Sequence, residues 1–351
     1  MLDRTKPFRL FAGCVPVRGA RRSSICDLQR GKLHLIPNGL YEIVTEHRDR
    51  TVPELEAMYG PECSETLQEY FTFLLGNDLG FWCDDPEAFP DLDLSWDRPE
   101  RVTNAIIDCG AGSAHDWESL FGQLDELGCK ALQLRFFVPI ALAELDAVLG
   151  LLHGTRARSV ELLLPWSGEW TREELRATVF PHQRVSGVVV HSAPMDGVDE
   201  GRPGDAVIRY RDEVMDSHAH CGQVHPAYFA VTLGAFTEAT GFNSCLNRKL
   251  SVDERGEIRN CPSMPRTFGN AAGTPLAAAL AAPGFRDPWS VTKDQVETCR
   301  DCEFRYVCTD CRAFTRESAE RHAKPSRCTY DPYAAKWDAS SSAAAALAAT
   351  G

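Results

Sequence analysis

The stretch VTNAIIDC, residues 102–109, is the first of four short apolar runs that decide the predicted fold. The other three runs are CKALQLRFF (129–137), SVELLLP (159–165) and RVSGVVVHS (184–192). Segments with helical periodicity separate them and are long enough for right-handed crossovers; they lie at 115–128, 139–154 and 171–180. This alternation predicts βαβ units. We therefore expect an α/β fold with a parallel sheet or partial parallel barrel, its strands buried on both faces.

Outward from these runs, the chain divides into three predicted parts and a tail. Residues 1–100 form the first part, 101–204 the partial α/β barrel, and 205–337 a cysteine-rich part. The tail, 338–351, consists of small residues with too little apolar bulk to pack, so we expect it to be disordered. Fold class alone does not name a function.

The first part begins with a strand-rich stretch at 21–37, and helices are predicted after it at about 38–47, 52–59 and 64–75. Thr51 is the expected N-cap of the second helix, and the third should end at Gly76-Asn77. The Pro- and Asp-rich stretch 84–100 shows little periodicity and is predicted to be a linker.

Composition narrows the class of protein. The net charge of −13 argues against a nucleic-acid partner, because a phosphate-binding surface needs a basic excess. We expect no membrane partner either, since no apolar stretch reaches the roughly 18 residues that a membrane span needs. The first residues, MLDRTKPFRLFAGC, contain no apolar signal-peptide core, so a cytoplasmic location is expected.

In a reducing cytoplasm, clustered cysteines indicate metal ligands rather than disulfides. Seven of the fourteen cysteines fall between Cys245 and Cys328, and four of these lie in CRDCEFRYVCTDC, residues 299–311. A predicted hairpin with the turn DERG separates Cys245 from Cys261 and would bring these two thiols together. The two C-x2-C pairs each allow two sulfurs to reach one metal from a tight turn.

The spacing leaves two kinds of metal site open. Cys299, Cys302, Cys308 and Cys311 could alone form the closed tetrahedral shell of a structural zinc. That site would leave the remaining three cysteines of the group without a role. Two [4Fe–4S] clusters, each held by four thiolates, would use all seven cysteines and require one further ligand.

The cysteine frame resembles a known family. Its order is C-x10-G-x4-C, then C-x2-C-x5-C-x2-C, then a final Cys, with Gly256 at the glycine. This order is similar to the SPASM domain, the auxiliary iron–sulfur module of many radical SAM peptide-modifying enzymes. In that family three residues usually separate the last two cysteines of the dense run, whereas here only Thr309 and Asp310 do.

The resemblance implies which cysteines share a cluster. The first cluster would take Cys245, Cys261 and Cys311, and the second Cys299, Cys302, Cys308 and Cys328. The first would then lack one ligand. Our candidate is Cys221, in SHAHCGQVHP; His218, His220, His225 or an open iron are the alternatives.

The function implied is peptide maturation. The radical SAM motif C-x3-C-x2-C is absent, so neither radical chemistry nor bound S-adenosylmethionine is expected. A SPASM module that follows a degenerate α/β domain is the arrangement of the SPASM-domain peptide maturases of grasp-with-spasm systems. The chain resembles this family in stretches such as CLNRKLSVDERGEIRNCPSMPRTFGN (245–270). These act on a ribosomal precursor peptide beside an ATP-grasp ligase. The chain could be an enzyme or a non-catalytic partner of that ligase, and a zinc-stabilised binding module is the alternative.

Two further hypotheses concern the other parts. Residues 1–100 resemble the winged-helix elements that bind precursor leaders by strand addition; a structural cap on the barrel is the alternative. Asp108, Glu161 and His191 fall near strand ends, where α/β folds bind ligands, but none is assigned a catalytic role. Gly110 and Gly112 lack the third glycine of a dinucleotide fingerprint and are predicted to form a tight turn.

Overall fold

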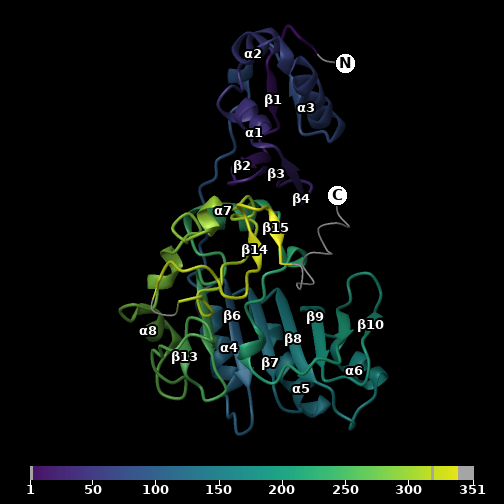
Figure 1. Cartoon of the computed structure of the whole chain (residues 1–351). Coiled ribbons are helices and arrows are strands. Elements are labelled where there is room, and N and C mark those ends of the chain that lie inside the picture. The colour runs from purple at the N-terminus through teal and green to yellow at the C-terminus, as the bar shows by residue number, and fades with distance from the viewer. Residues whose placement is uncertain (1–2, 318–319, 339–351) are drawn as a thin grey trace.

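The computed structural model describes residues 3–317 and 320–338, so the predicted tail lies outside the described residues apart from Asp338. Figure 1 shows the N-terminal unit at one end of the molecule and the large sheet at the other. Much of the cysteine-rich part lies between them. Among the described residues, no helix is long and apolar enough to cross a membrane.

The N-terminal unit combines three antiparallel strands with three helices. The strands are β2 (Cys14–Val17), β3 (Ser23–Asp27) and β4 (Lys32–Ile36), in that order across the sheet. The helices are α1 (Asn38–Thr45), α2 (Val52–Tyr59) and α3 (Ser64–Gly76), and β1 (Phe8–Leu10) pairs with β5 (Gly80–Trp82). Thr51 is the N-cap of α2, and α3 ends at Gly76, as the sequence predicts. Between residues 84 and 100 the described chain contains only a short 3-10 turn, Pro86–Ala88.

The large sheet confirms the four predicted strands. They are β6 (Asn104–Cys109), β7 (Ala131–Phe136), β8 (Ser159–Pro165) and β9 (Val185–His191), all parallel. Four further strands complete the order β10-β11-β9-β8-β7-β6-β12-β13: β10 (Gly197–Glu200), β11 (Val207–Tyr210), β12 (Lys249–Val252) and β13 (Ile258–Arg259). The two outermost pairs are antiparallel. Because β11 and β12 join this sheet, it extends across the predicted boundary at 204/205.

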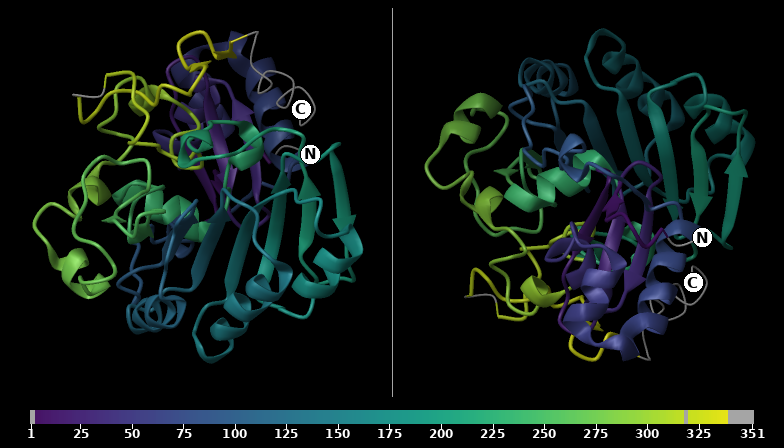
Figure 2. Two further views of the ribbon diagram at one scale, coloured as in Figure 1. Left: turned by 90° about the horizontal axis from the view of Figure 1, so that it is seen from below. Right: turned by 90° about the horizontal axis from the view of Figure 1, so that it is seen from above.

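Helices cover one face of the sheet. These are α4 (Trp117–Glu126), α5 (Leu142–Gly150) and α6 (Arg172–Val179), and Figure 2 shows α4 and α5 on the side away from the N-terminal unit. One row of paired residues on this face is buried in the main core together with the helices. The row is Val252, Ile107, Leu134, Leu162, Val188 and Ile208.

The opposite face carries polar side chains among apolar ones and is exposed in part, which corrects the prediction of strands buried on both faces. The neighbouring row is Ser251, Ile106, Gln133, Glu161, Gly187 and Val207. In it Glu161 is exposed and accepts a hydrogen bond from Gln133 at 3.0 Å. Every second residue of each strand belongs to the apolar core, which is why the four runs look apolar in the sequence. Polar residues such as Gln133 stand between these core residues and face the other side of the sheet. Below, this surface is called the polar face.

The cysteine-rich part has little regular structure. Its helices are α7 (Leu233–Gly241) and α8 (Leu276–Ala281), and its final strands are β14 (Tyr330–Asp331) and β15 (Lys336–Trp337). The remaining 3-10 turns of the described chain are Pro61–Cys63, Leu151–Gly154, His218–His220, Pro226–Tyr228, Asp287–Ser290 and Cys299–Asp301.

This part also binds the N-terminal unit. The buried Glu303 accepts from Arg22 Nε at 2.7 Å, and its carbonyl accepts from Ser24 Oγ at 2.8 Å. Val17 and Cys26 of the N-terminal strands pack in one apolar cluster with Phe304. The segment around Glu303 and Phe304 therefore lies against the N-terminal unit.

Candidate metal centres

The predicted hairpin between Cys245 and Cys261 is confirmed. β12 and β13 pair antiparallel, and Gly256 in the turn has a φ of +82°, a conformation that favours glycine. Burial raises the pKa of Cys261 to about 12, and the next cause is the negative charge of Cys245. The two sulfurs therefore lie within electrostatic reach of each other.

Three cysteines lie within electrostatic reach of Lys249, and a fourth lies within reach of two of these three. Burial disfavours the Lys249 ammonium, yet its pKa is raised overall by the negative charges of Cys245, Cys261 and Cys221. Its Nζ lies 3.5 Å from Cys245 Sγ. The fourth member is Cys311, whose pKa is raised by burial and by the charges of Cys245 and Cys221. We call these four residues the first set: Cys221, Cys245, Cys261 and Cys311.

The loop that follows Cys221 touches Cys311 directly. A Cβ added at Gly222 would lie 2.9 Å from Cys311 Sγ, and Gly222 has a φ of +84°. A side chain at this position would collide with the sulfur and strain the backbone. Glycine therefore lets the exposed Cys221 approach the rest of the first set.

The other four cysteines also lie near one another, and two of them, Cys308 and Cys299, lie near Lys293. This lysine is only 4% exposed, and its Nζ donates to Cys308 Sγ at 3.3 Å and to the Thr309 carbonyl at 3.2 Å. Burial raises the pKa of Cys299 to about 11, with contributions from the charges of Cys308 and Cys328. The pKa of Cys302 is also raised, first by burial and then in part by Cys308 and Cys299. We call these residues the second set: Cys299, Cys302, Cys308 and Cys328.

Several sulfurs accept backbone N–H groups. Burial raises the pKa of three thiols, and backbone hydrogen bonds to their sulfurs oppose this rise. The donors are Ser263 for Cys261, Phe304 for Cys302, and Phe314 and Ala313 for Cys311. N–H donors of this kind stabilise thiolates and orient ligands in metal sites. The donor chemistry of both sets thus suits an all-thiolate group.

Thr309 and Asp310 link the two sets, because Cys308 belongs to the second and Cys311 to the first. Asp310 is fully buried, and its carboxylate accepts from Arg312 at 2.6 Å and from Asn243 Nδ2 at 2.8 Å. The same Asn243 side chain accepts from the backbone N–H of Cys245 at 3.1 Å. These contacts fix the position of the link beside the start of the hairpin.

The first set also adjoins the polar face of the sheet. Asp108 and Arg135, on β6 and β7, form a buried two-bonded ion pair with distances of 2.6 and 2.7 Å. Burial disfavours the charge on Arg135, but Asp108 raises its pKa, with smaller contributions from Cys221 and Cys261. The sheet thus presents a buried cation toward the first set.

The three alternative histidine ligands make other contacts. His218 Nδ1 lies 3.2 Å from Ser263 Oγ, while His220 Nε2 lies 3.3 Å from Asp216 Oδ1. His225 Nδ1 accepts from the backbone N–H of Ala227 at 3.1 Å. Across residues 3–317 and 320–338, no group of three or more His, Cys, Asp or Glu side chains is arranged to hold a single metal ion.

The remaining residues near strand ends have structural partners. Asp108 is paired with Arg135, and Glu161 with Gln133. His191 is buried, and its Nδ1 accepts from the Met215 N–H at 3.4 Å. The backbone N–H of Gly110 donates to Ser113 Oγ at 2.9 Å, and the Ser113 N–H returns to the Gly110 carbonyl at 3.1 Å, which confirms a tight turn.

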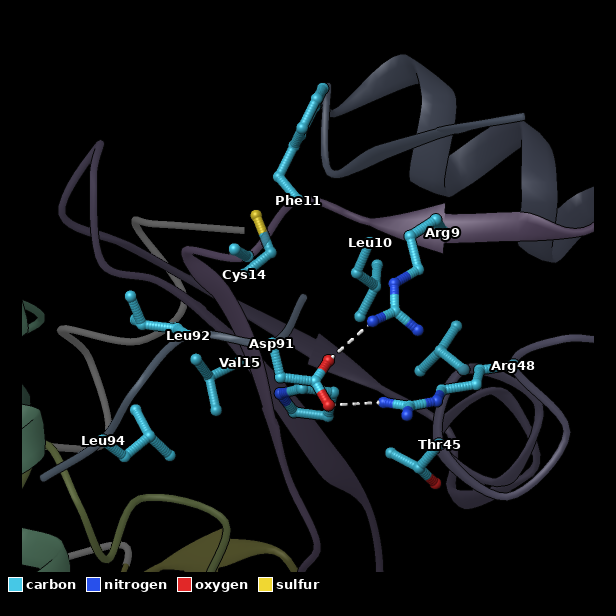
Figure 3. Close-up of a pocket in the computed structure, with 13 residues that line it drawn as sticks. Arg9, Leu10, Phe11, Cys14, Val15, Thr45, Arg48, Asp91, Leu92 and Leu94 are labelled. Atoms are coloured by element: carbon cyan, nitrogen blue, oxygen red, sulfur yellow. Dashed lines mark hydrogen bonds and ion pairs between the residues drawn. The ribbon is translucent and has the colours of Figure 1, made fainter. Parts of the chain in front are cut away.

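A separate pocket of about 280 Å³ lies on the N-terminal unit. Figure 3 shows Arg9 and Arg48 pointing to the carboxylate of Asp91, at 2.9 and 2.7 Å, beside the apolar side chains of Leu92 and Leu94. Asp91 raises the pKa of Arg48 through this bond. The segment before the sheet is thus fastened to the N-terminal unit.

Neither a scan against protein-family models nor a search of curated proteins finds a match for this chain. The local geometry therefore carries the functional argument. Sequence reasoning missed Lys249, Lys293 and the Asp108–Arg135 pair. A signal existed for Lys249, which lies inside the predicted hairpin, but Lys293 is separated from its partner Cys308 by a stretch without regular pattern.

Proposed function

We propose that this chain holds two [4Fe–4S] clusters and acts in the maturation of a ribosomally synthesised peptide, beside an ATP-grasp ligase. The observation that carries the proposal is the proximity of eight cysteines in two sets of four, each set with a lysine at one of its sulfurs. This grouping is consistent with the connectivity that the SPASM resemblance implies, and Cys221 would supply the ligand that the resemblance leaves open.

We prefer iron–sulfur clusters to zinc because the SPASM resemblance implies them, and the two kinds of group place different demands on the sulfurs. A single zinc needs its sulfurs to converge at about 2.3 Å from one point. Such convergence is not found in the described part of the chain, although the thiols of each set are within electrostatic reach of one another. A four-iron cluster binds one thiolate at each of four separate irons, so its ligands are spread more widely.

Bound clusters would supply electron transfer or a Lewis-acidic iron. The protein's own residues would bind and orient the peptide. The polar face offers hydrogen-bonding groups, Glu161 and Gln133, on the side of the sheet that also carries Arg135, which lies within electrostatic reach of the first set. Without the radical motif, no S-adenosylmethionine chemistry is part of the proposal.

The N-terminal unit is proposed to recognise the precursor. Its three strands and three helices are consistent with a winged-helix leader-binding element, and β4 is an edge strand that can accept another strand. The neighbouring face of α3 presents Glu65 and Glu69 along a shallow depression. An acidic border of this kind favours a basic leader segment. Thiol-rich sites of this type are stable in the reducing cytoplasm, where we place the protein.

The deciding experiment is anaerobic purification followed by quantification of iron, sulfide and zinc. We expect about eight irons and eight sulfides per chain, from two four-iron clusters, with a low-temperature electron paramagnetic resonance (EPR) signal after reduction. Zinc without sulfide would reject the clusters and leave a zinc-stabilised binding module.

A second experiment tests the biological role. Product formation by the ligase on its precursor peptide would be compared with and without this chain. Dependence on the chain supports a direct role as enzyme or scaffold, and product that forms equally well without it rejects both.

A further inference from the structure

Each cysteine set contains one lysine whose ammonium approaches a thiol sulfur. Lys249 lies on β12 and approaches Cys245, whereas Lys293 lies in an irregular loop and approaches Cys308. The two lysines come from unrelated parts of the chain and from different local structures. The same contact therefore arises twice independently.

Within residues 3–317 and 320–338, neither lysine forms an ion pair with a carboxylate. Lys293 donates to Cys308 Sγ and the Thr309 carbonyl, and the nearby carboxylate of Asp310 is already bonded to Arg312 and Asn243. Lys249 donates to Cys245 Sγ. A buried ammonium is costly unless a negative group compensates it. In both places the neighbouring sulfurs become that group once a bound cluster holds them as thiolates.

We infer that Lys249 and Lys293 set the reduction potentials of the two clusters, an inference that rests on the proposed function. Reduction places one additional electron, and so one additional negative charge, on the cluster and its thiolates. A positive charge and an N–H donor at a ligand sulfur stabilise that reduced state and raise the potential. The electron would come from a low-potential one-electron donor.

The two effects should differ in size. Both ammonium groups are shielded from water, but the Lys293 residue as a whole is the more buried of the two and its Nζ–Sγ distance is shorter, 3.3 Å against 3.5 Å for Lys249. Water screens a charge less as burial increases. The second cluster should thus respond more strongly to loss of its lysine than the first.

The test is an EPR-monitored redox titration of the full chain, with dithionite as reductant, for wild type, Lys249→Met and Lys293→Met. We expect Lys293→Met to shift the reduction equilibrium of one cluster at least tenfold toward the oxidised state, which is 59 mV for a one-electron couple. Lys249→Met should shift the other cluster by less. Arginine variants, which retain the charge, should restore most of each shift.

Lys32→Met is the matched control, because Lys32 is an exposed lysine on β4 outside both sets. The inference is overturned if methionine variants with full iron and sulfide have the wild-type reduction potentials. It is also overturned if one single variant shifts the reduction potentials of both clusters equally. If the methionine variants lose iron, the titration is repeated with glutamine variants, which keep an N–H donor. Loss of iron in the glutamine variants as well would overturn the inference and assign the lysines to retention of the clusters.

The wild-type measurement separates the two hypotheses. A wild-type chain without acid-labile sulfide rejects the proposed function itself. If the wild-type chain holds both clusters but replacement of either lysine leaves their reduction potentials unchanged, only this inference is rejected.

Discussion

The large sheet and the segment 290–338 are stabilised in different ways. The sheet and its helices share one continuous apolar core, in which residues such as Leu134 and Leu162 are almost completely buried. In the described part of segment 290–338 the regular elements are one 3-10 turn and two strands of two residues each. Its own apolar cluster consists of Val291, Val296 and Cys299.

Charged groups are buried beside the apolar ones in that segment. Lys293, Glu303, Asp310 and Lys324 are all buried there, and Phe304 and Val307 pack in the apolar cluster shared with the N-terminal strands. Hydrophobic burial is non-directional, whereas buried charges need specific partners to avoid a large desolvation cost. The sheet thus relies mainly on its apolar core, while the segment relies also on specific partners for its buried charges.

The largest effect should follow Cys308→Ala. This substitution removes a second-set thiol and the sulfur partner of Lys293. We expect iron content to fall by about half, because one of two equal clusters is lost, and amide protection to disappear across 290–338 while the sheet keeps its own. Hydrogen exchange with mass spectrometry measures this. Cys63→Ala, outside both sets, is the control; a protected segment with full iron would contradict the prediction.

The sheet should respond in the opposite way to Leu134→Ala. Leu134 is fully buried on the helix-covered face, so its truncation should lower the free energy of unfolding by about 2–5 kcal/mol. Iron per folded chain should remain unchanged. Urea denaturation gives the free energy, and Leu163→Ala, on the half-buried opposite face, is the control and should cost less. Equal costs would show that both faces are packed alike.

Cys221→Ser should separate ligation from stability. Cys221 is exposed, so its replacement should change the free energy of unfolding by no more than about 0.5 kcal/mol. As a first-set ligand it should nevertheless alter the EPR signal of one cluster. Cys63→Ser, at a half-buried cysteine outside both sets, should have no such effect, and an unaltered spectrum in Cys221→Ser would remove Cys221 from the ligand set.

The smallest effect concerns pH and the sheet. Burial lowers the pKa of His191; the Phe136 carbonyl and Asp216 oppose this shift, and His220 adds to it. The ring is neutral in both states above its ordinary pKa of about 6.5. As the pH falls below about 6.5, the unfolded chain binds a proton before the folded protein does. The free energy of unfolding therefore decreases between about pH 6.5 and the lowered pKa of His191 in the folded protein. His191→Gln should flatten this slope in denaturation curves, while His153→Gln, at an exposed position, should not.

The amount predicted from sequence differs between the same two regions. The four strands, the helices between them and the hairpin at Gly256 follow from apolar periodicity and turn chemistry, which are local. The polar face was not predicted, because Gln133 and Glu161 stand inside runs that are otherwise apolar. The resemblance to SPASM domains implied the grouping of cysteines, but spacing alone left zinc and iron–sulfur ligation open.

The sequence by itself therefore determined which segments form strands, helices and turns, and which cysteines are dense enough to indicate a metal. Only the tertiary structure decided that Cys221 approaches Cys311, that Arg135 faces the first set, and that Lys249 and Lys293 each reach a thiol. The physical reason is distance along the chain. Secondary structure depends on neighbours a few residues away, whereas these contacts form only when the sheet and the loops pack together.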